Sequence, residues 1–264
     1  MLHRNVLVDA TRIRSGGAVS HLATFIDYIS REASDAERPI RWHFWVDASS
    51  WHVCNLYVRD TIRVVCVSVP IAQRAVDALV QGILFPVMLR LGCFSICLTL
   101  DAATLNLSRK QIVMSQDLLA FDPAGSSSVK GLAAKFRLQI IKVLQLLAFR
   151  RSVHNIFISN YGKSLLAPLV LRNCSDSSVI GLGVRDVFRR RLKESFYCKG
   201  GYRLIYISPY FEYKKHQVAI DAVWKLLHHG CNIQLEMYGL DHVGCQELRK
   251  SAKSQELLAS GNLH

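Results

Sequence analysis

The sequence predicts an α/β protein built on a parallel sheet, and two observations indicate this fold class. Short apolar runs of strand length alternate with segments whose apolar residues have helical spacing. The first run ends in a loop with Ser15, Gly16 and Gly17 before a helical segment, which is how a doubly wound domain begins. The alternation continues for about 185 residues and restarts near residue 202. We therefore expect one complete lobe and the beginning of a second.

The elements of the first lobe, residues 1–185, follow from this alternation. Four helices are expected, over residues 18–30, 75–91, 129–150 and 162–171. Ser126, Ser127 and Ser128 offer hydroxyl oxygens that would cap the third of these helices. Strands are expected over residues 6–8, 41–46, 61–69, 93–100, 111–114, 155–158 and 179–180.

The second lobe, residues 202–264, is predicted to follow a linker at 186–201 that contains Gly200 and Gly201. Strands are expected over 202–207 and 233–237, and helices over 216–229 and 245–258. Two strands and two helices are too few for a well-covered parallel sheet. We therefore expect this lobe to be partial and the chain to be C-terminally truncated.

Length and composition narrow the protein class. The chain has 264 residues, of which 50% are hydrophobic and 20% are charged. These values exclude a disordered or collagen-like chain and predict a sizeable core. The eight cysteines include no Cys-x-x-Cys pair and several lie in apolar runs, which favours free thiols in a reducing compartment over a zinc site.

The most apolar stretch, residues 79–100, is predicted to be a buried helix followed by a buried strand. Gln81, Pro86, Arg90 and Gly92 interrupt it, and a membrane-spanning helix requires about 20 consecutive apolar residues. The N-terminus contains no long apolar signal core. The expected location is the cytoplasm.

The net charge of +13 indicates an anionic partner. Nucleic acid, an acidic membrane surface and a phosphorylated small molecule all satisfy this requirement. Because the basic residues are dispersed and no nucleic-acid-binding motif is present, we do not expect nucleic acid to be the partner.

Gly16 and Gly17 lie between the first strand and the first helix. Glycines at such a junction let backbone N–H groups approach a phosphate or a sugar, and the helix dipole there favours negative charge. The segment matches neither a Walker A sequence nor Gly-x-Gly-x-x-Gly. A simple tight turn is the alternative interpretation.

Gln116 and Asp117 follow the apolar strand at 111–114. Ligands of parallel α/β sheets bind at the carboxyl ends of the strands, so this polar pair could face a cleft. A turn or helix-capping aspartate is the alternative.

Lys214 and Lys215 lie between a strand and a helix, shortly after Ser208. A lysine at a helix N-terminus is unfavourable to the helix itself, but it adds positive charge where a diphosphate would bind. A solvated lysine pair is the alternative.

Several segments, in this order, resemble the GT-B-fold glycosyltransferases of family 4. The resemblance covers nearly the whole chain. Each motif is weakly specific by itself, but their order and spacing together are characteristic. The matching segments are residues 6–22, with the first strand and glycine loop; 112–121, with the polar pair; 157–161, with Ser159-Asn160-Tyr161; 179–184; and 203–217, with the two lysines.

The resemblance implies retaining transfer of a sugar from a nucleotide-diphosphate sugar to a glycan or lipid-linked acceptor, as in cell-surface polysaccharide synthesis. The first lobe would hold the acceptor, with Gln116 and Asp117 at catalytic positions. Gly16, Gly17, Ser208, Lys214 and Lys215 would lie at the donor phosphates, and Lys215 would stabilise the leaving diphosphate. No metal or other cofactor is implied.

The chain also departs from the family pattern. Gln116 replaces the histidine of many members, and Asp117 replaces an asparagine. The family's pair of glutamates, further along the second lobe, is not reached. We therefore expect impaired activity of this chain, and a non-catalytic nucleotide-sugar or glycan-binding remnant is the alternative.

The long helix expected from residue 129 carries basic residues among leucines and isoleucines. Such a helix can lie peripherally on an anionic membrane, here the inner face, close to a lipid-linked acceptor. A core helix with a solvated basic back is the alternative. The basic residues concerned are Lys130, Lys135, Arg137, Lys142, Arg150 and Arg151.

Overall fold

The computed structural model describes residues 4–14, 16–32, 40–54, 62–67, 73–127, 129, 131–170, 177–183, 201–239 and 242–264. The chain divides into two compact units. The first unit comprises Met1–Ser126 and Leu132–Arg189, and the second comprises Ser127–Gly131 and Arg190–His264. The expected linker at 186–201 lies outside the described residues, apart from Gly201.

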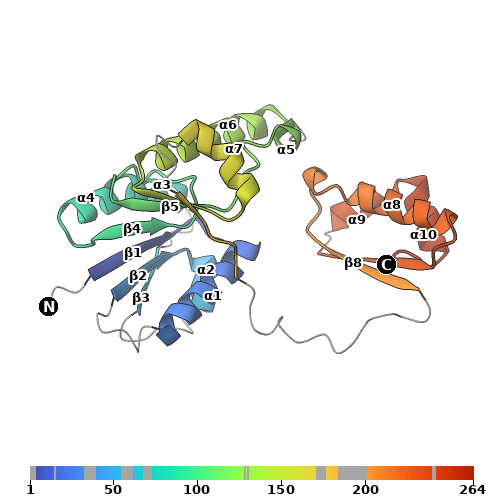
Figure 1. Ribbon diagram of the computed structural model, residues 1–264, viewed down its shortest axis with the longest axis horizontal. Coiled ribbons are helices and arrows are strands. Elements are labelled where there is room, and N and C mark those ends of the chain that lie inside the picture. Colours follow the sequence, from blue (N-terminus) through green and yellow to red (C-terminus); the bar gives the residue numbers. More distant parts are fainter. Residues whose placement is uncertain are drawn as a thin grey trace. The chain divides into compact units, whose positions relative to one another are not determined.

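The first unit contains a seven-stranded parallel sheet in the order β3-β2-β1-β4-β5-β6-β7 (Figure 1). Each strand lies within or overlaps a strand predicted from the sequence, and the α/β fold class is confirmed. The order reverses between β1 and β4, so their carboxyl ends form a topological switch point. The strands are β1 Arg4–Ala10, β2 Ile40–Val46, β3 Ile62–Cys66, β4 Ile96–Thr99, β5 Gln111–Ser115, β6 His154–Phe157 and β7 Ser177–Val179.

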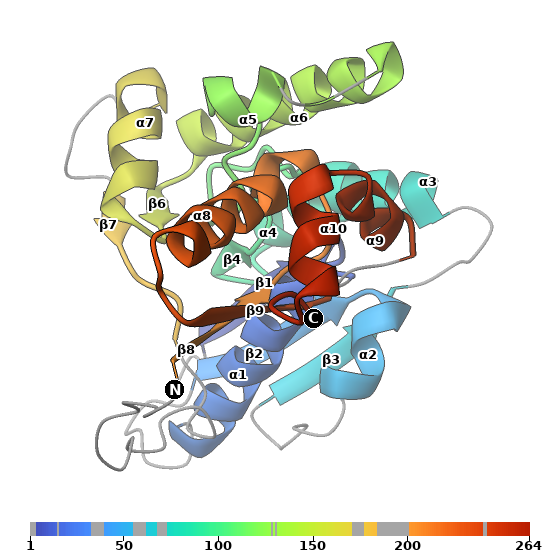
Figure 2. The ribbon, with the colours of Figure 1, turned by 90° about the vertical axis from the view of Figure 1, so that its right-hand side faces the viewer.

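Helices cover both faces of this sheet (Figure 2). On one face, α1 (Gly16–Glu32) and α2 (Ala48–Cys54) enclose a core that includes Val8 of β1. On the other face, the neighbouring Leu7 packs with residues of α4 (Phe85–Arg90). Because successive strand residues point to opposite faces, β1 is buried on both sides.

Further along the sheet, α6 (Leu132–Arg151) and α7 (Asn160–Val170) pack against β5 and β6. Phe149 of α6 and Leu166 of α7 share a core with Phe157 of β6. These two helices lie on the same side of the sheet as α4 (Figure 2).

The helix predicted over 75–91 is present but is not regular. It consists of α3 (Gln73–Leu79), a π-helical turn η2 (Val80–Leu84) and α4. Pro86, which has no N–H to donate, lies directly after this turn. The π-helical turn leaves both Val80 and Gln81 buried, and such turns often occur at functional positions.

The predicted start of the long helix was wrong. Ser126 and Ser127 belong to a separate short helix, α5 (Pro123–Ser127), and α6 begins only at Leu132. The physical reason lies upstream, where Asp122 accepts a hydrogen bond from the N–H of Gly125 at 2.9 Å. Proline is well suited to the first helical position, so α5 starts there. Ser128 lies outside the described residues.

The second unit contains two parallel strands, β8 (Tyr202–Ile207) and β9 (Ile233–Tyr238), in a sheet separate from the first. Helix α8 (His216–His228) follows β8, and its Ile220 and Val223 pack on β9. The helix predicted over 245–258 is interrupted, because Ser251 accepts a hydrogen bond from Ser254 and starts a new helix. The two pieces are α9 (His242–Arg249) and α10 (Ala252–Ala259).

The lengths and compositions of the helices show whether any of them could span a membrane. None of the described helices combines the length and apolar character needed to cross a membrane.

Candidate functional site

A buried carboxylate lies at the switch point of the first sheet. Asp9 of β1 is only 2% exposed. Its Oδ1 accepts hydrogen bonds from the backbone N–H and the hydroxyl of Thr11, at 3.2 and 2.8 Å. Burial raises the pKa of Asp9, and the hydrogen bonds from Thr11 and Gln81 offset this only in part.

Gln81 of the π-helical turn connects this carboxylate to its surroundings. Its Nε2 donates to Asp9 Oδ2 at 3.1 Å and to the Thr11 hydroxyl at 3.0 Å. Its Oε1 accepts from the backbone N–H of Leu105 at 3.3 Å. One buried amide therefore joins the end of β1, the π-helical turn and the loop between β4 and β5.

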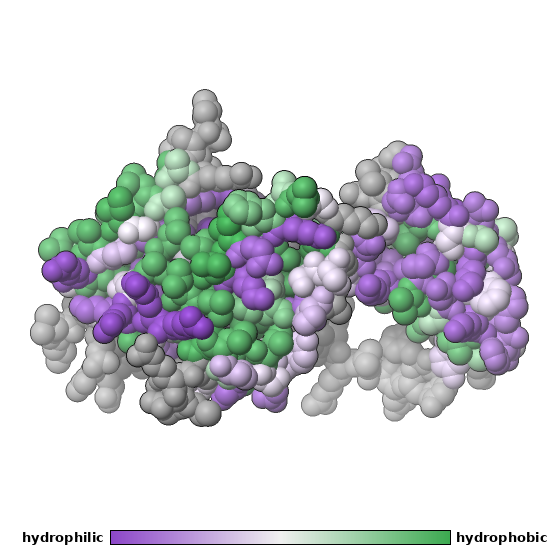
Figure 3. Space-filling view, turned by 90° about the horizontal axis from the view of Figure 1, so that it is seen from above, coloured by the Kyte–Doolittle hydropathy of each residue, from purple (hydrophilic) through white to green (hydrophobic). Residues whose placement is uncertain are grey.

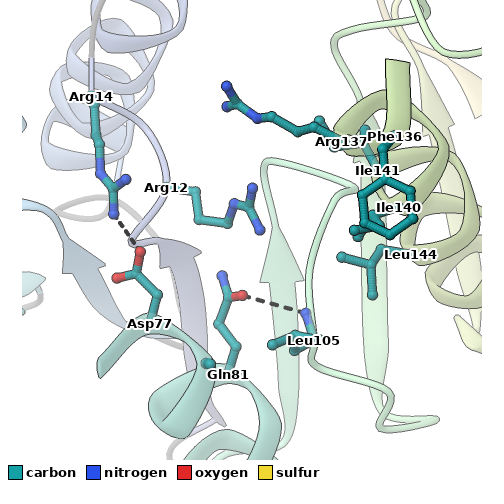
Figure 4. A pocket seen from close by; sticks show the side chains of 11 residues that line it. Arg12, Arg14, Asp77, Gln81, Leu105, Phe136, Arg137, Ile140, Ile141 and Leu144 are labelled. Atoms are coloured by element: carbon teal, nitrogen blue, oxygen red, sulfur yellow. Dashed lines mark hydrogen bonds and ion pairs between the residues drawn. The ribbon is translucent and has the colours of Figure 1, made fainter. Parts of the chain in front are cut away.

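A pocket of about 470 Å³ lies against this network (Figure 4). On one side Arg14 forms ion pairs with Asp77 and with Asp47, the latter at 3.0 Å. Burial alone would raise the pKa of Asp47, but hydrogen bonds from Ser49 and Arg14 outweigh it and lower the pKa. The lining residues are Arg12, Arg14, Asp77, Ala78, Gln81, Leu105, Phe136, Arg137, Ile140, Ile141 and Leu144.

Two other arginines extend into the pocket from opposite sides, Arg12 from the loop after β1 and Arg137 from α6 (Figure 4). Arg12 lies 3.5 Å from Asp101, and both of these side chains are partly exposed. Among the residues that the structure describes, Arg137 has no hydrogen-bond or ion-pair partner. The wall on the α6 side is apolar.

The glycine loop and Gln116 are both placed at the same edge of the first sheet. Gly16 has a φ of +68° and is the first residue of α1, so a side chain there would be strained. Gln116, just beyond β5, lies with its Nε2 3.3 Å from Nδ1 of His21 in α1. Burial lowers the pKa of His21, which favours the neutral imidazole. His21 is the only histidine in the first helix, but no motif in the sequence marks it as a site residue.

Asp117 is placed as the turn interpretation predicts. Its Oδ1 accepts a hydrogen bond from the backbone N–H of Leu119 at 2.9 Å. Its carbonyl oxygen accepts from Gln145 of α6 at 3.4 Å. The side chain is exposed, so this turn function is the one the described contacts support.

The second candidate group surrounds the carboxyl end of β8. Lys215 is the N-cap of α8, with φ +59° and ψ +38°, and it is exposed. It is the only described residue other than glycine with a positive φ. The ammonium of Lys214 lies 5.1 Å from the centre of the Tyr213 ring. Ser208 is buried, and its N–H donates to the carbonyl of Tyr238 at 2.9 Å.

His216, the first residue of α8, is a further polar group at this position. It is 2% exposed, its Nε2 lies 3.4 Å from the carbonyl oxygen of Ser208, and its Nδ1 has no partner. The rings of Tyr206 and Tyr210 lie 4.8 and 5.4 Å from it. In the sequence, His216 is marked only as the first residue of the helix predicted over 216–229.

The predicted site residues therefore fall into two groups. Gly16, Gly17, Gln116 and Asp117 belong to the first unit, and Ser208, Lys214 and Lys215 belong to the second. In the described part of the chain, no three or more His, Cys, Asp or Glu side chains gather as a metal site would require.

Comparisons with protein-family models and with curated protein sequences gave no match. Solved structures are similar. The lipopolysaccharide outer core galactosyltransferase WaaB is 13% identical, with a TM-score of 0.59 over 99% of this chain and 67% of that one. A glycosyltransferase from Rickettsia africae ESF-5 is also 13% identical, with a TM-score of 0.59 over 100% and 68%. WaaG, a glycosyltransferase involved in lipopolysaccharide biosynthesis, is 11% identical, with a TM-score of 0.58 over 98% and 69%.

The chain has a GT-B-like fold. It spans about two thirds of the length of these neighbours, in agreement with one lobe and part of a second. In a GT-B-like fold each parallel sheet presents its ligand-binding edge at the carboxyl ends of its strands. Both groups of candidate residues lie at such edges.

Proposed function

We propose that this chain takes part in the transfer of a sugar from a nucleotide-diphosphate sugar to an acceptor, with retention of the anomeric configuration. The observation that carries the proposal is Lys215 at the N-terminus of α8, beyond the carboxyl end of β8, in a GT-B-like fold. The first backbone N–H groups of a helix have no acceptor further back in the helix and attract phosphate. In α8 the N–H of Val218 already donates to the carbonyl of Lys215 at 3.0 Å, so the N–H groups of His216 and Gln217 are the ones that a phosphate would meet. An ammonium at the same position would stabilise the charge that develops on the leaving diphosphate.

The first unit would hold the acceptor. Gly16 and Gly17, proposed to lie at the donor phosphates, leave open space beside the acceptor at the start of α1, since a Cβ on either would meet no atom within 4 Å. The hydrogen-bonded side chains of Gln116 and His21 lie at the adjacent end of β5. In this proposal the amide of Gln116 orients the acceptor, and the turn at Asp117 holds the segment in place.

The proposal is tested by offering the chain a panel of nucleotide-diphosphate sugars with glycan and lipid-linked acceptors. We expect release of the nucleoside diphosphate that depends on the acceptor, and a product whose anomeric configuration by proton NMR equals that of the donor. A product of inverted configuration would contradict retention. Donor binding without any release, across the panel, would contradict transfer by this chain.

We also propose that the acceptor is lipid-linked and that the first unit contacts the inner face of an anionic membrane from the cytoplasm. Leu132 and Phe136 in the first half of α6 are 88% and 69% exposed, and Val143 further along the helix is 53% exposed. On the same face of the sheet, Ile83 and Leu91 near α4 are 59% and 74% exposed. Figure 3 looks onto this face of the first unit and shows hydrophobic side chains gathered on it. Neither α6 nor residues 79–91 contain an acidic residue, whereas α6 carries five basic ones. Exposed apolar side chains interspersed with basic ones along α6 suit an anionic lipid surface.

Sedimentation with vesicles tests this contact. We expect binding to vesicles rich in phosphatidylglycerol, weak binding to phosphatidylcholine alone, and a loss of about tenfold for the single variant Leu132→Asp. Tyr28→Asp, on exposed α1 of the opposite face, is the matched control and should bind normally. Equal binding to both vesicle types, or equal losses for both variants, would contradict the proposed surface.

A further inference from the structure

We infer that the pocket at the switch point of the first sheet binds the phosphate group of an amphiphile, with Arg12 and Arg137 holding the phosphate and α6 holding the apolar chain. The inference rests on the proposed function in one respect, because it makes this amphiphile the acceptor and so names the acceptor's chemical class. The pocket itself lies wholly within the first unit.

The charges that line the pocket favour an anion. Three arginines and one carboxylate, Asp77, line it. Asp77 is paired with Arg14, and Arg14 also contacts Asp47. These contacts leave Arg12 and Arg137 as the cations able to meet a ligand. A guanidinium presents a planar set of N–H donors that matches the oxygens of a phosphate.

Neither arginine has to give up a strong contact. Arg12 reaches Asp101 only at 3.5 Å in a partly exposed pair, and such pairs contribute little. Arg137 has no partner in the described chain, so an incoming phosphate would be its first. The two side chains enter from opposite sides of the pocket (Figure 4), which allows both to contact one ligand.

The apolar wall distinguishes an amphiphile from a free phosphate. Phe136 and Ile140 are 69% and 46% exposed although both line the pocket, and Ile141 and Leu144 extend the same wall. A free phosphate would leave this surface in water, whereas a hydrocarbon chain would cover it. The free energy of binding would then become more favourable in proportion to the apolar area covered. The wall belongs to the helix that the proposed function places at the membrane.

The floor of the pocket is built to stay in place. Gln81 is 2% exposed, and its amide uses both ends in hydrogen bonds, to Asp9 and Thr11 on one side and to Leu105 on the other. It is presented by the π-helical turn rather than by a loop. A floor fixed in this way lowers the ordering cost of binding a ligand.

The test measures binding by calorimetry, without any sugar donor, to three probes: a short prenyl monophosphate below its critical micelle concentration, the corresponding prenyl alcohol, and inorganic phosphate. We expect saturable binding of the prenyl monophosphate and binding at least about tenfold weaker for each of the other probes. Arg137→Ala and Arg12→Ala should each weaken prenyl monophosphate binding about tenfold. Arg109→Ala removes the same charge from an exposed position outside the pocket and should bind normally.

Ile140→Ala separates the two halves of the inference, since it should weaken the prenyl monophosphate and leave inorganic phosphate unaffected. If inorganic phosphate binds as tightly as the prenyl monophosphate, the claim that the ligand is an amphiphile is contradicted. If the prenyl alcohol binds as tightly as the prenyl monophosphate, the claim that the arginines hold a phosphate is contradicted. If Arg109→Ala and Arg137→Ala weaken prenyl monophosphate binding equally, the loss is due to net charge alone, and the proposed site is contradicted. Because no donor is present, the binding result stands apart from transfer. Transfer that is observed but unchanged in Arg137→Ala would overturn this inference alone.

Discussion

Replacing Lys215 with glycine should weaken binding of a nucleoside diphosphate about 10- to 100-fold and lower the rate of sugar transfer about 100-fold. The ammonium is removed from the N-terminus of α8, while glycine readily adopts the positive φ that Lys215 has there. The fold should therefore be unharmed, and the free energy of unfolding should rise by about 1 kcal/mol. Calorimetric titration and thermal unfolding of the same samples measure both effects.

The matched control for this prediction is Lys225→Ala, which removes one positive charge from the last turn of the same helix. It should leave nucleotide binding within about twofold of the unmodified chain, because it lies away from the helix N-terminus. Lys215→Arg should retain most of the binding. A Lys215→Gly variant that binds and turns over normally would remove Lys215 from the leaving-group role.

Replacing Asp9 with alanine should lower the free energy of unfolding by about 3 kcal/mol. The N–H and hydroxyl of Thr11 and the amide of Gln81 would all lose a buried acceptor, and each unsatisfied buried donor costs about 1–3 kcal/mol. Removing the buried charge offsets part of this loss. Urea unfolding measures the difference, and Asp27→Ala, which breaks an ion pair with Arg31 within α1, should cost less than about 1 kcal/mol.

The difference in unfolding free energy between the unmodified chain and Asp9→Ala should change with pH in a direction that the pKa of Asp9 determines. Burial raises the pKa of Asp9 above its ordinary value of 3.8, so the folded protein holds this proton more tightly than the unfolded chain. The contribution of Asp9 to stability is then largest below pH 3.8 and declines as the pH rises through its folded pKa. The gap between the unmodified chain and Asp9→Ala should therefore narrow as the pH rises over that range. A gap that widens would contradict the burial account.

The sequence predicted the seven strands and most of the helices that connect them because each signal is local. An apolar run of strand length, or an apolar face at helical spacing, can be recognised without knowing what packs on it. Helix α2 was missed because it has only seven residues, too few for a periodic pattern. Its start is marked instead by Asp47, whose carboxylate accepts from the N–H and the hydroxyl of Ser49.

The pocket could not be predicted from the sequence because its parts are far apart in the chain. Arg12, Gln81 and Arg137 come from the loop after β1, the π-helical turn and α6. Gln81 was visible only as an interruption of an apolar run, and nothing in helical periodicity marks a π-helical turn. Asp9 directly follows the strand predicted over residues 6–8, and only the register of β1 between β2 and β4 shows that it is buried.

For the site residues, the sequence predicted the local backbone structure better than it predicted the function. The positive φ of Gly16 agrees with the tight turn that was the alternative interpretation of that glycine. Of the two interpretations of Asp117, the described contacts support the turn, because its carboxylate accepts a hydrogen bond from the N–H of Leu119.

The measurement that tests the central claim most directly is a titration of the isotope-labelled chain with uridine diphosphate, and with other nucleoside diphosphates in parallel, followed by backbone amide NMR. The account predicts saturable shifts for the amides of Ser208 and of residues 215–218, which surround the end of β8 and the start of α8. The absence of saturable shifts with every nucleoside diphosphate, or shifts confined to the first unit, would contradict it.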